Sequence, residues 1–478
     1  MPDQIKTYKI EIPFVLLIFG ASGDLAKLKL FPAIYSLIEQ NRLPDNFFIF
    51  GFARTVKTLN TFRNDFKKSI LEKYKDKVDK TKLNKLLEKI HYFQGQYSEI
   101  QSFRKLKDKI FELTNSRKIT KIAYFSVPPT AFKDIIQNLG KTKHFKNEDI
   151  RLVLEKPFGE DTKSAQELFH FTANYFKEDQ IYLLDHYLSK AAVQSILHLR
   201  HGNRILNLLL KGPEISNIQI TASEKIGVNE RAGYFDQVGT LKDMVQSHLL
   251  QVMALLTMSI PISLTAENIQ REKFSIISAL TFPKYPQNIV LGQYESYKKE
   301  KNVPKNSKTE TFVALRLFID RESWYKVPIY IRTGKKLNKK HTYIIVEFKK
   351  FAFQSANEEP NRLYIELQPE ERMTLRLLNR HGISSKYEEI TSSQSIGYDK
   401  EDALPEHGIL LLDIIRGRKL RFLSFAEIIA TWKLTDTITS FIRNNQQIPI
   451  ETYKDNSEGP ASQNKITKSD NCKWFNLG

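Results

Sequence analysis

The chain has 478 residues, of which 41% are apolar and 27% charged, so it can form two or three packed domains and is not an intrinsically disordered protein. Its one cysteine, Cys472, excludes a disulfide framework and a cysteine-based metal site, and this usage predicts a cytoplasmic protein without a bound metal. The N-terminal residues lack a signal-peptide pattern, and the longest apolar stretch, residues 249–264, is shorter than the roughly 20 residues of a membrane span, so no membrane association is expected.

The first 190 residues alternate short apolar runs with helical patterns. Five runs have the length and composition of buried parallel strands: Phe14–Phe19, Phe47–Phe52, Ile122–Val127, Leu152–Leu154 and Ile181–Leu184. A helix is expected over Ala131–Leu139, with Thr130 as its N-cap and Gly140 as its C-terminal stop. This alternation predicts an α/β fold in which residues 1–190 form a Rossmann-like domain with a doubly wound parallel sheet.

The first predicted strand runs into a glycine-containing turn that precedes a helix. Gly20, Gly23 and Ala26 are spaced as G-x-x-G-x-x-A, which differs from the common G-x-G-x-x-G. Glycines at this place let backbone N–H groups approach a pyrophosphate, and the following helix N-terminus favours negative charge. The second strand is followed by Arg54, where NAD-binding domains usually carry an acid and where a guanidinium suits a 2′-phosphate. The sequence therefore predicts NADP as the cofactor.

The formal net charge of +19 suits two classes of partner, nucleic acids and small anionic substrates. Lysines concentrate in Lys67–Lys89, and apolar residues recur there at helical spacing: Phe62, Phe66, Ile70, Tyr74 and Val78, then Leu83, Leu86, Leu87 and Ile90. This pattern predicts two surface helices with their lysines in solvent. The other lysines are spread along the chain and no nucleic-acid-binding motif is present, so no nucleic acid partner is expected. A basic nucleic-acid-binding protein that reuses the fold is kept as an alternative.

From about residue 190 the pattern changes to longer β-rich runs. They are Ile215–Ser223, Phe312–Ile319, Tyr343–Phe348 and Leu363–Leu367. These runs predict that residues 191–478 form a large α+β domain with a mainly antiparallel sheet. The tail from Thr452 is polar and poor in pattern, so it is predicted to be a surface extension.

Four sequence blocks, in order along the chain, carry a specific resemblance. They are GASGDLAKLKLFPA (20–33), EKPFG (155–159), DHYLSK (185–190) and GVNERAGYFDQVGTLKDMVQSHLLQ (227–251), with weaker matches in SVPPT (126–130), GQY (292–294), VPIYIRTGKKL (327–337) and LQPEE (367–371). In these blocks the chain resembles the glucose-6-phosphate dehydrogenase family. The resemblance implies oxidation of glucose 6-phosphate at C1 to 6-phosphogluconolactone with hydride transfer to NADP, the first step of the oxidative pentose phosphate pathway. It also implies a homodimer or homotetramer formed through the sheet of the second domain.

The resemblance implies cofactor and catalytic roles for individual residues. Lys156 of EKPFG is implied to touch both cofactor and substrate. His248 is implied to be the catalytic base, and Asp185 the carboxylate that orients it. The cofactor contacts implied are Gly20, Ser22, Gly23, Asp24, Leu25 and Arg54, with Gln96 and Tyr97 on the adenosine side.

The resemblance also implies the substrate contacts. The sugar phosphate is implied to bind His186, Tyr187 and Lys190, and the sugar hydroxyls to bind Glu224 and Asp243. Lys335 is implied as a further substrate lysine, and Lys340 as a phosphate contact. Because His186 and Lys190 are four residues apart, we expect them to share one helix face.

The residue types suit this chemistry. Oxidising the C1–OH of a hemiacetal to a lactone removes a proton and a hydride, and a histidine, which titrates near neutral pH, suits the proton. An aspartate that accepts a hydrogen bond from the other ring nitrogen would fix the tautomer. Periodicity alone places His248 on an apolar stripe with Leu241 and Val252, which is typical of a core histidine. Only the resemblance favours the catalytic role.

Several positions beside these residues depart from the family pattern. Leu183 and Leu184 stand where the family has Arg-Ile, and Ser247 replaces its Asn. Further departures are Ser189 and Ala191 on either side of Lys190, residues 321–328 and residues 406–411. A loosened supporting shell lowers rate without abolishing function. A second alternative is therefore a divergent paralogue, weakly active or regulatory, that binds NADP or a sugar phosphate.

Overall fold

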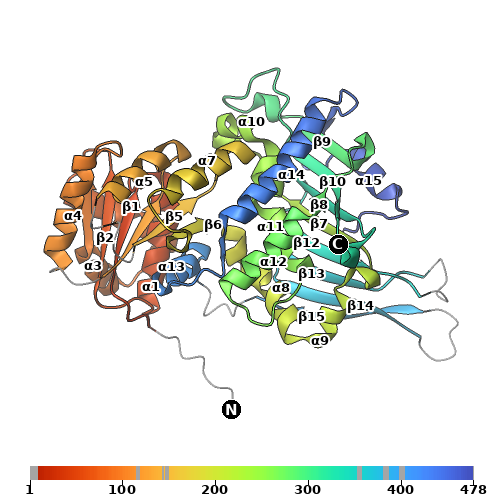
Figure 1. Ribbon diagram of the computed structural model, residues 1–478, viewed down its shortest axis with the longest axis horizontal. Helices are drawn as coiled ribbons and strands as arrows, with labels where there is room; N and C mark the ends of the chain where they lie inside the picture. The colour runs from red at the N-terminus through yellow and green to blue at the C-terminus, as the bar shows by residue number, and fades with distance from the viewer. Residues whose placement is uncertain are drawn as a thin grey trace, which may run out of the picture. The chain divides into compact units, whose positions relative to one another are not determined.

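The computed structural model describes residues 9–114, 119–142, 145, 150–351, 358–380, 387–397 and 404–476. The chain forms two compact units, Met1–Ser189 with Lys400–Ile428, and Lys190–Asp399 with Ile429–Gly478 (Figure 1). The sequence analysis placed one boundary after residue 190 and so assigned residues 400–428 to the second domain, whereas the structure groups them with the first unit. Among the helices of the described residues, none is both long and apolar enough to cross a membrane.

A parallel sheet forms the centre of the first unit. Within the described residues it has seven strands in the order β3-β2-β1-β4-β5-β6-β16, all parallel except β16. The strands are β1 (Phe14–Phe19), β2 (Phe47–Ala53), β3 (Ile90–Gln94), β4 (Thr120–Phe125), β5 (Ile150–Glu155), β6 (Ile181–Leu184) and β16 (Phe422–Leu423). The order 3-2-1-4-5-6 is that of the doubly wound dinucleotide-binding fold, which confirms the predicted fold class. Strand β3 was not predicted, because His91 and Gln94 interrupt its apolar run.

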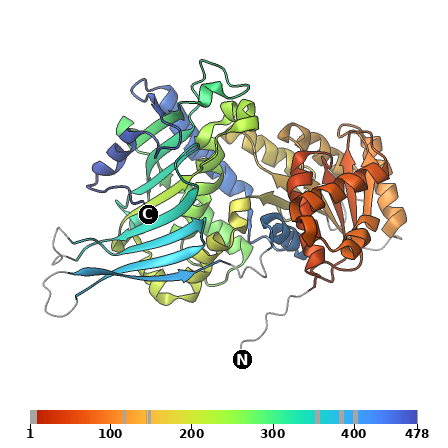
Figure 2. The ribbon, with the colours of Figure 1, turned by 180° about the vertical axis from the view of Figure 1, so that it is seen from behind.

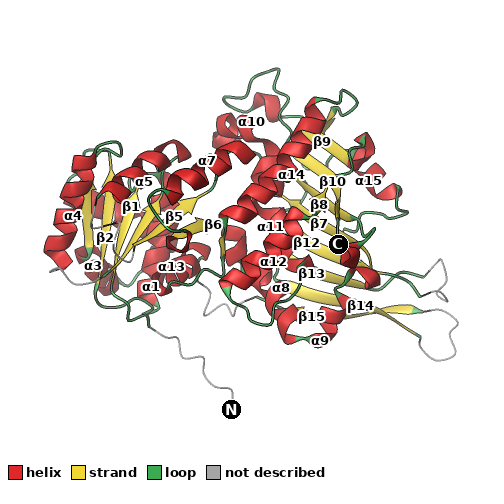
Figure 3. Ribbon diagram, in the orientation of Figure 1, coloured by secondary structure: helices red, strands yellow, loops and turns green. Residues whose placement is uncertain are grey.

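Helices cover both faces of this sheet (Figure 3). One face carries α1 (Phe31–Glu39), α2 (Leu59–Tyr74), α3 (Lys80–Glu88) and α13 (Glu406–Arg416), whose apolar residues share a core with alternate residues of β1. The other carries α4 (Ile100–Thr114), α5 (Phe132–Lys141) and α7 (Thr162–Ala173). There the ring of Phe103 stacks on Phe19, with centroids 5.8 Å apart. The strands are therefore buried on both sides, as their continuous apolar runs predict.

Residues 404–428 join the first unit through long-range contacts that no local pattern encodes. Leu410, Leu411 and Ile414 of α13 belong to the core beneath α1. The Arg151 guanidinium on β5 donates to the carbonyls of Ile414 and Ile415 at 2.5 and 2.7 Å, which satisfies carbonyls at the end of α13. Strand β16 then adds to the edge of β6.

The lysine-rich region forms the two predicted helices, α2 and α3, but with different ends. Val78 lies in an extended turn between them, because α2 ends at Tyr74 and Asp79 caps α3 by accepting the Thr81 N–H at 2.8 Å. Ile90 begins β3 and is not helical.

The expected ends of the helix after β4 were wrong. Ala131, not Thr130, is the N-cap of α5, because a short 3₁₀ turn precedes the helix. Gly140 lies inside α5 and does not stop it. A Cβ at this position would lie 2.4 Å from the ring of Tyr175, so the glycine serves close packing.

A large, mainly antiparallel sheet forms the second unit, as predicted. Its order is β15-β14-β13-β12-β7-β11-β10-β9-β17, with β8 paired to β10, and only the pairs β7–β11 and β9–β17 are parallel among the described strands. The strands are β7 (Ile215–Ser223), β8 (Leu280–Thr281), β9 (Ile289–Tyr294), β10 (Phe312–Ile319), β11 (Ile329–Gly334), β12 (His341–Phe348), β13 (Arg362–Gln368), β14 (Arg372–Asn379), β15 (Glu388–Ser395) and β17 (Ile450–Tyr453).

Helices pack on one face of this sheet, and Figure 2 shows it from behind. The helices of this unit include α8 (Ala191–Gly202), α9 (Arg204–Leu209), α10 (Ala232–Thr240), α11 (Leu250–Thr257), α12 (Ala266–Ser278) and the C-terminal part of α14 (Phe425–Arg443). A π-helical segment, η8 (Leu241–Leu249), joins α10 to α11. A π-turn inside a helix is rare and often lies at a functional site.

The C-terminal tail is part of the second unit, so the prediction of a surface extension was wrong. Strand β17 extends the sheet, and α15 (Asn464–Lys468) follows. Trp474 is 8% exposed, and the guanidinium of Arg332 lies 4.5 Å from the centre of its ring. Arg332 also donates to Thr221 and Tyr343 at 3.0 Å. The tail was misjudged because its apolar residues are isolated in sequence and meet their partners only across the sheet.

Candidate active site

The turn after β1 closes tightly against the neighbouring strands. The Gly20 N–H donates to the Phe52 carbonyl at 2.8 Å, and Gly20 has a φ of +83°. A Cβ at Gly20 would lie 2.0 Å from the Ser126 carbonyl oxygen, so only glycine fits. The Gly23 N–H donates to the Gly20 carbonyl at 2.9 Å, and the chain then enters the helical residues Ala26–Leu30. The turn thus has the form of a backbone cradle before a helix N-terminus, which fits a dinucleotide pyrophosphate.

The predicted adenosine-side residues lie at the ends of β2 and β3. Arg54 is exposed, and its guanidinium lies 5.7 Å from the centre of the Tyr97 ring. Tyr97 packs on Phe52 in a stacked arrangement with ring centroids 5.7 Å apart. Burial raises the pKa of the Tyr97 hydroxyl, although the nearby Arg54 charge opposes the shift. Gln96 is exposed, and its backbone N–H donates to Ser102 Oγ at 3.2 Å. An aromatic ring beside an exposed guanidinium fits an adenosine phosphate.

The remaining residues of the first turn differ in exposure. Ser22 and Leu25 are half-buried and Asp24 is exposed. The hydroxyl of Ser22 is 3.2 Å from that of Thr55, so Thr55 belongs to the same surface. The sequence analysis did not select Thr55, because its only signal is its position immediately after Arg54.

Lys156 and Asp185 also follow parallel strands, β5 and β6. Since the carboxyl ends of parallel strands meet at one edge, they lie on the same edge of the sheet as Gly20 and Arg54. Lys156 is half-buried and precedes Pro157, to which it is joined by a cis peptide bond. Asp185 is 2% exposed, and its Oδ1 accepts the backbone N–H of Tyr187 at 2.9 Å. The carboxylate thereby fixes the start of the next turn.

His186 and Lys190 do not share a helix face, so this expectation was wrong. Residues His186–Ser189 form a 3₁₀ turn, η5, and Lys190 has an extended backbone as the N-cap of α8. The Ser189 hydroxyl donates to the His186 carbonyl at 2.7 Å, which closes the turn before α8 begins. Tyr187 and Lys190 are buried, with 7% and 8% of their surfaces exposed, and His186 is half-buried.

In the second unit, three predicted substrate residues meet in space. The Lys335 ammonium pairs with Glu224 Oε2 and lies 3.4 Å from Asp243 Oδ2. These residues follow β11, follow β7 and lie on η8, respectively. The same ammonium lies 5.1 Å from the centre of the Phe235 ring. A lysine between two carboxylates offers a donor and acceptors in one place, which suits a polyhydroxylated ligand. Lys340 is exposed and is not part of this group.

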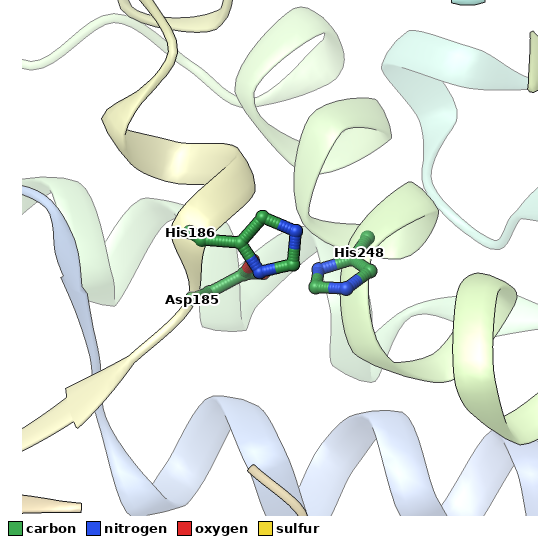
Figure 4. A group of neighbouring side chains, drawn as sticks. All are labelled: Asp185, His186 and His248. Carbon is green, nitrogen blue, oxygen red and sulfur yellow. The ribbon is translucent and has the colours of Figure 1, made fainter. Parts of the chain in front are cut away.

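His248 lies on η8, five residues beyond Asp243. It is 1% exposed, as its apolar stripe predicted. The neighbouring Ser247 hydroxyl donates to the Lys242 carbonyl at 2.9 Å, so the serine that replaces the family's Asn has a partner within the segment. Figure 4 shows Asp185 and His186 directly after β6, and His248 on its helix.

A parallel sheet in the 3-2-1-4-5-6 order with a glycine turn, and a second unit that carries a histidine, a lysine and two carboxylates, define a dinucleotide-dependent oxidoreductase. Residues 17–195 match the family model described as glucose-6-phosphate dehydrogenase, NAD binding domain, and residues 197–475 match its C-terminal domain. The chain belongs to the glucose-6-phosphate dehydrogenase family.

Relatives and solved structures agree over nearly the full length. The glucose-6-phosphate 1-dehydrogenase of Caenorhabditis elegans is 32% identical, covering 97% of this chain and 92% of the relative. That of Chlamydia muridarum is 35% identical, covering 97% and 96%. A structure of glucose-6-phosphate dehydrogenase in complex with glucose-6-phosphate is 30% identical and covers 98% and 100%, with a TM-score of 0.89.

Proposed function

We propose that the chain oxidises glucose 6-phosphate at C1 to 6-phosphogluconolactone, with NADP as the hydride acceptor. Family membership supplies the reaction class. The observation that carries the assignment to this chain is the group formed by Lys335, Glu224 and Asp243, which share a unit with His248. The chain has these four side chains although several neighbouring positions depart from the family pattern.

In the proposed reaction, His248 takes the proton of the C1 hydroxyl. As the O–H bond breaks, the C1–O bond becomes a carbonyl, and the hydrogen on C1 leaves with the electron pair of the C1–H bond as hydride. Asp185 accepts from the other ring nitrogen of His248, which fixes the tautomer and stabilises the imidazolium. NADP, when bound, supplies the nicotinamide C4 that accepts the hydride. Lys156 and Lys335 orient the reacting sugar, and Glu224 and Asp243 accept from its hydroxyls.

Specificity for NADP over NAD is proposed to come from Arg54. Its exposed guanidinium beside the Tyr97 ring suits a 2′-phosphate, whereas an NAD site would carry an acid. Backbone at Gly20 and Gly23, with Ser22, Asp24 and Leu25, is proposed to hold the pyrophosphate.

The sugar phosphate is proposed to bind His186, Tyr187 and Lys190, with Lys340 as an outer contact. A phosphate needs several donors and positive charge at short range, and these residues provide imidazole, hydroxyl and ammonium groups. Because Lys190 follows η5 as an N-cap, its position relative to His186 is set by the turn and not by helical spacing.

Two further properties are inferred for the whole protein. We infer a homodimer or homotetramer formed through the second unit's sheet, whose edge strand β15 exposes all eight of its side chains. We also infer a cytoplasmic location from the single cysteine. Light scattering of the purified chain and fractionation of the source cells test these two inferences.

The function is tested by offering glucose 6-phosphate, other sugar phosphates and free glucose with NADP or NAD, and following nicotinamide reduction by absorbance. We expect the highest kcat/KM for glucose 6-phosphate with NADP, and a far lower value for free glucose because it lacks the phosphate's binding energy. If the chain binds NADP but none of the sugar phosphates supports its reduction, the chain is a non-catalytic paralogue. A salt-sensitive complex with RNA or DNA together with absent turnover would favour the nucleic-acid alternative.

A further inference from the structure

The five residues before β10, Ser307–Thr311, contact α10, the start of η8 and Lys335 in the second unit. We call this segment the strap. It was not selected from the sequence, and it contains none of the residues assigned to catalysis or binding. All its contacts described below lie within the second unit.

The N-terminal half of the strap is fixed to α10. The Ser307 hydroxyl donates to Asp236 Oδ1 at 2.5 Å, and the Thr309 hydroxyl donates to the Asp236 carbonyl at 2.5 Å. The Tyr297 hydroxyl donates to the same Oδ1 at 2.9 Å. One aspartate in the middle of α10 thus anchors two strap residues.

Glu310 binds the start of η8, the segment that carries Asp243 and His248. Its Oε1 accepts the Leu241 N–H at 3.0 Å, and its backbone carbonyl accepts the Thr240 N–H at 3.1 Å. A carboxylate at a helix N-terminus is favoured by the unpaired N–H groups there. Burial raises the pKa of the Glu310 carboxyl, and its hydrogen bond with Leu241 opposes that shift.

Gly239 permits this approach. Its φ is +74°, and a Cβ there would lie 2.4 Å from Glu310 Oε1. The carboxylate therefore occupies the space that any other residue at position 239 would need.

Thr311 holds the backbone of Lys335. Its carbonyl accepts the Lys335 N–H at 2.9 Å. Its hydroxyl is 2.9 Å from the Tyr453 hydroxyl, which donates to the Lys335 carbonyl at 2.7 Å. Both backbone polar groups of Lys335 are thus tied to Thr311, directly or through one tyrosine.

We infer that the strap is a positioning device that sets the place of η8 relative to Lys335. Consecutive residues, Glu310 and Thr311, hold the helix that bears His248 and Asp243 on one side and Lys335 on the other. The ion pair between Lys335 and Asp243 also connects Lys335 to η8, but through side chains alone. Since an ångström-scale displacement of reacting groups lowers rate strongly, this backbone link matters for turnover. The inference rests on the proposed function, and Glu310 is a positioning residue that does not touch substrate.

The test compares Glu310→Ala with Glu310→Gln in the full-length chain. Glu310→Ala removes the acceptor of the Leu241 N–H, so we expect kcat to fall about 10- to 100-fold and KM for glucose 6-phosphate to rise. KM for NADP should stay unchanged, because the glycine turn after β1, which is proposed to bind NADP, belongs to the first unit. Glu310→Gln keeps an acceptor oxygen and should recover most of the lost rate. A loss of folded protein alone would lower the apparent kcat of both variants without moving KM.

A matched control is Thr265→Ala. Thr265 Oγ1 accepts the Asn268 N–H at 3.2 Å and caps α12, which carries no proposed site residue. Both Ala variants lose a helix cap, so both should lower Tm. Only Glu310→Ala should change the kinetic constants. Equal kinetics for the two variants and wild type would overturn the inference.

Hydrogen exchange keeps this inference separate from the proposed function. In Glu310→Ala, backbone exchange in residues 240–249 and at Lys335 should become faster than in wild type and in Thr265→Ala. If wild type turns over no sugar phosphate, the proposed function fails but this readout still tests the strap. Unchanged exchange in both segments would overturn it.

Discussion

The two units hold their candidate functional residues in different ways. In the first unit, Gly20 and Gly23 form the nucleotide turn from consecutive backbone, and Arg54 and Tyr97 stand at the ends of neighbouring strands. In the second unit, Lys335 meets carboxylates from two distant segments, and a separate strap holds the backbone around it. A backbone site depends on conformation at single positions, whereas a side-chain site depends on distant segments keeping their spacing. The first should fail abruptly on substitution and the second by degrees.

The largest expected effect is that of Gly20→Ala. The added Cβ would lie 2.0 Å from the Ser126 carbonyl oxygen, and the residue would keep a φ of +83°. We expect a loss of stability of about 3 kcal/mol or more, together with loss of NADP binding. Chemical denaturation and fluorescence titration with NADPH measure both.

Gly23→Ala is the matched comparison within the same turn. Its nearest contact would be the Gly20 carbonyl oxygen at 3.2 Å, and its φ is not positive, so the fold should be much less affected. Equal losses for the two variants would mean that the strained position is not what defines the turn.

A smaller effect is expected for Arg54→Ala, which removes a side chain and leaves the backbone turn intact. A lost charged hydrogen bond costs about 1.5–3 kcal/mol, so KM for NADP should rise about 10- to 100-fold while KM for NAD changes little. Lys67→Ala removes the same charge from an exposed position on α2 and serves as the control. Parallel losses for NADP and NAD would take Arg54 out of the 2′-phosphate role.

The smallest expected effect concerns pH and the framework of the first unit. Burial lowers the pKa of His91 on β3, and the charges of Arg63 and Lys109 lower it further. The unfolded chain then binds a proton at a higher pH than the folded one, so stability is full above about pH 6.5 and falls as pH decreases. His91→Phe, which keeps the stacking on Phe50, should make the loss of stability at low pH smaller. Denaturation at pH 8 and pH 5 compares the slopes, and an unchanged slope would assign the acid loss to other groups.

Much of the fold was predictable from local sequence. The strands of the first sheet are continuous apolar runs because both faces are covered, and the glycine turn is a run of consecutive residues. Strand β3, helix α13 and the tail around Trp474 were not predictable in this way. In β3 and the tail the apolar residues are few or isolated, whereas α13 is rich in apolar residues whose core partners are far away in the sequence. Each of the three segments is stabilised by partners more than 40 residues away or by sheet pairing.

The site residues likewise divide into those that local sequence predicts and those that it does not. The positions of Gly20 and Arg54 after their strands were correctly predicted, since strand ends fix them. The substrate roles of Lys335, Glu224 and Asp243 were implied only by the family resemblance. No spacing in the sequence brings these residues together, and their contact is seen only in the structure. Glu310 carries no motif, and its role becomes visible only through its hydrogen bond with Leu241. The 3₁₀ turn before Lys190 was missed because four-residue spacing is also the spacing of a helix.

His248 is the proposed base in the oxidation of glucose 6-phosphate by NADP. The most direct measurement is the turnover of His248→Asn beside wild type, with NADP affinity determined for both. We predict that kcat falls about 100-fold or more while the Kd of NADP stays unchanged, because only the proton acceptor is lost. A His248→Asn enzyme with near-normal kcat would show that His248 is a core histidine and would contradict the proposed mechanism.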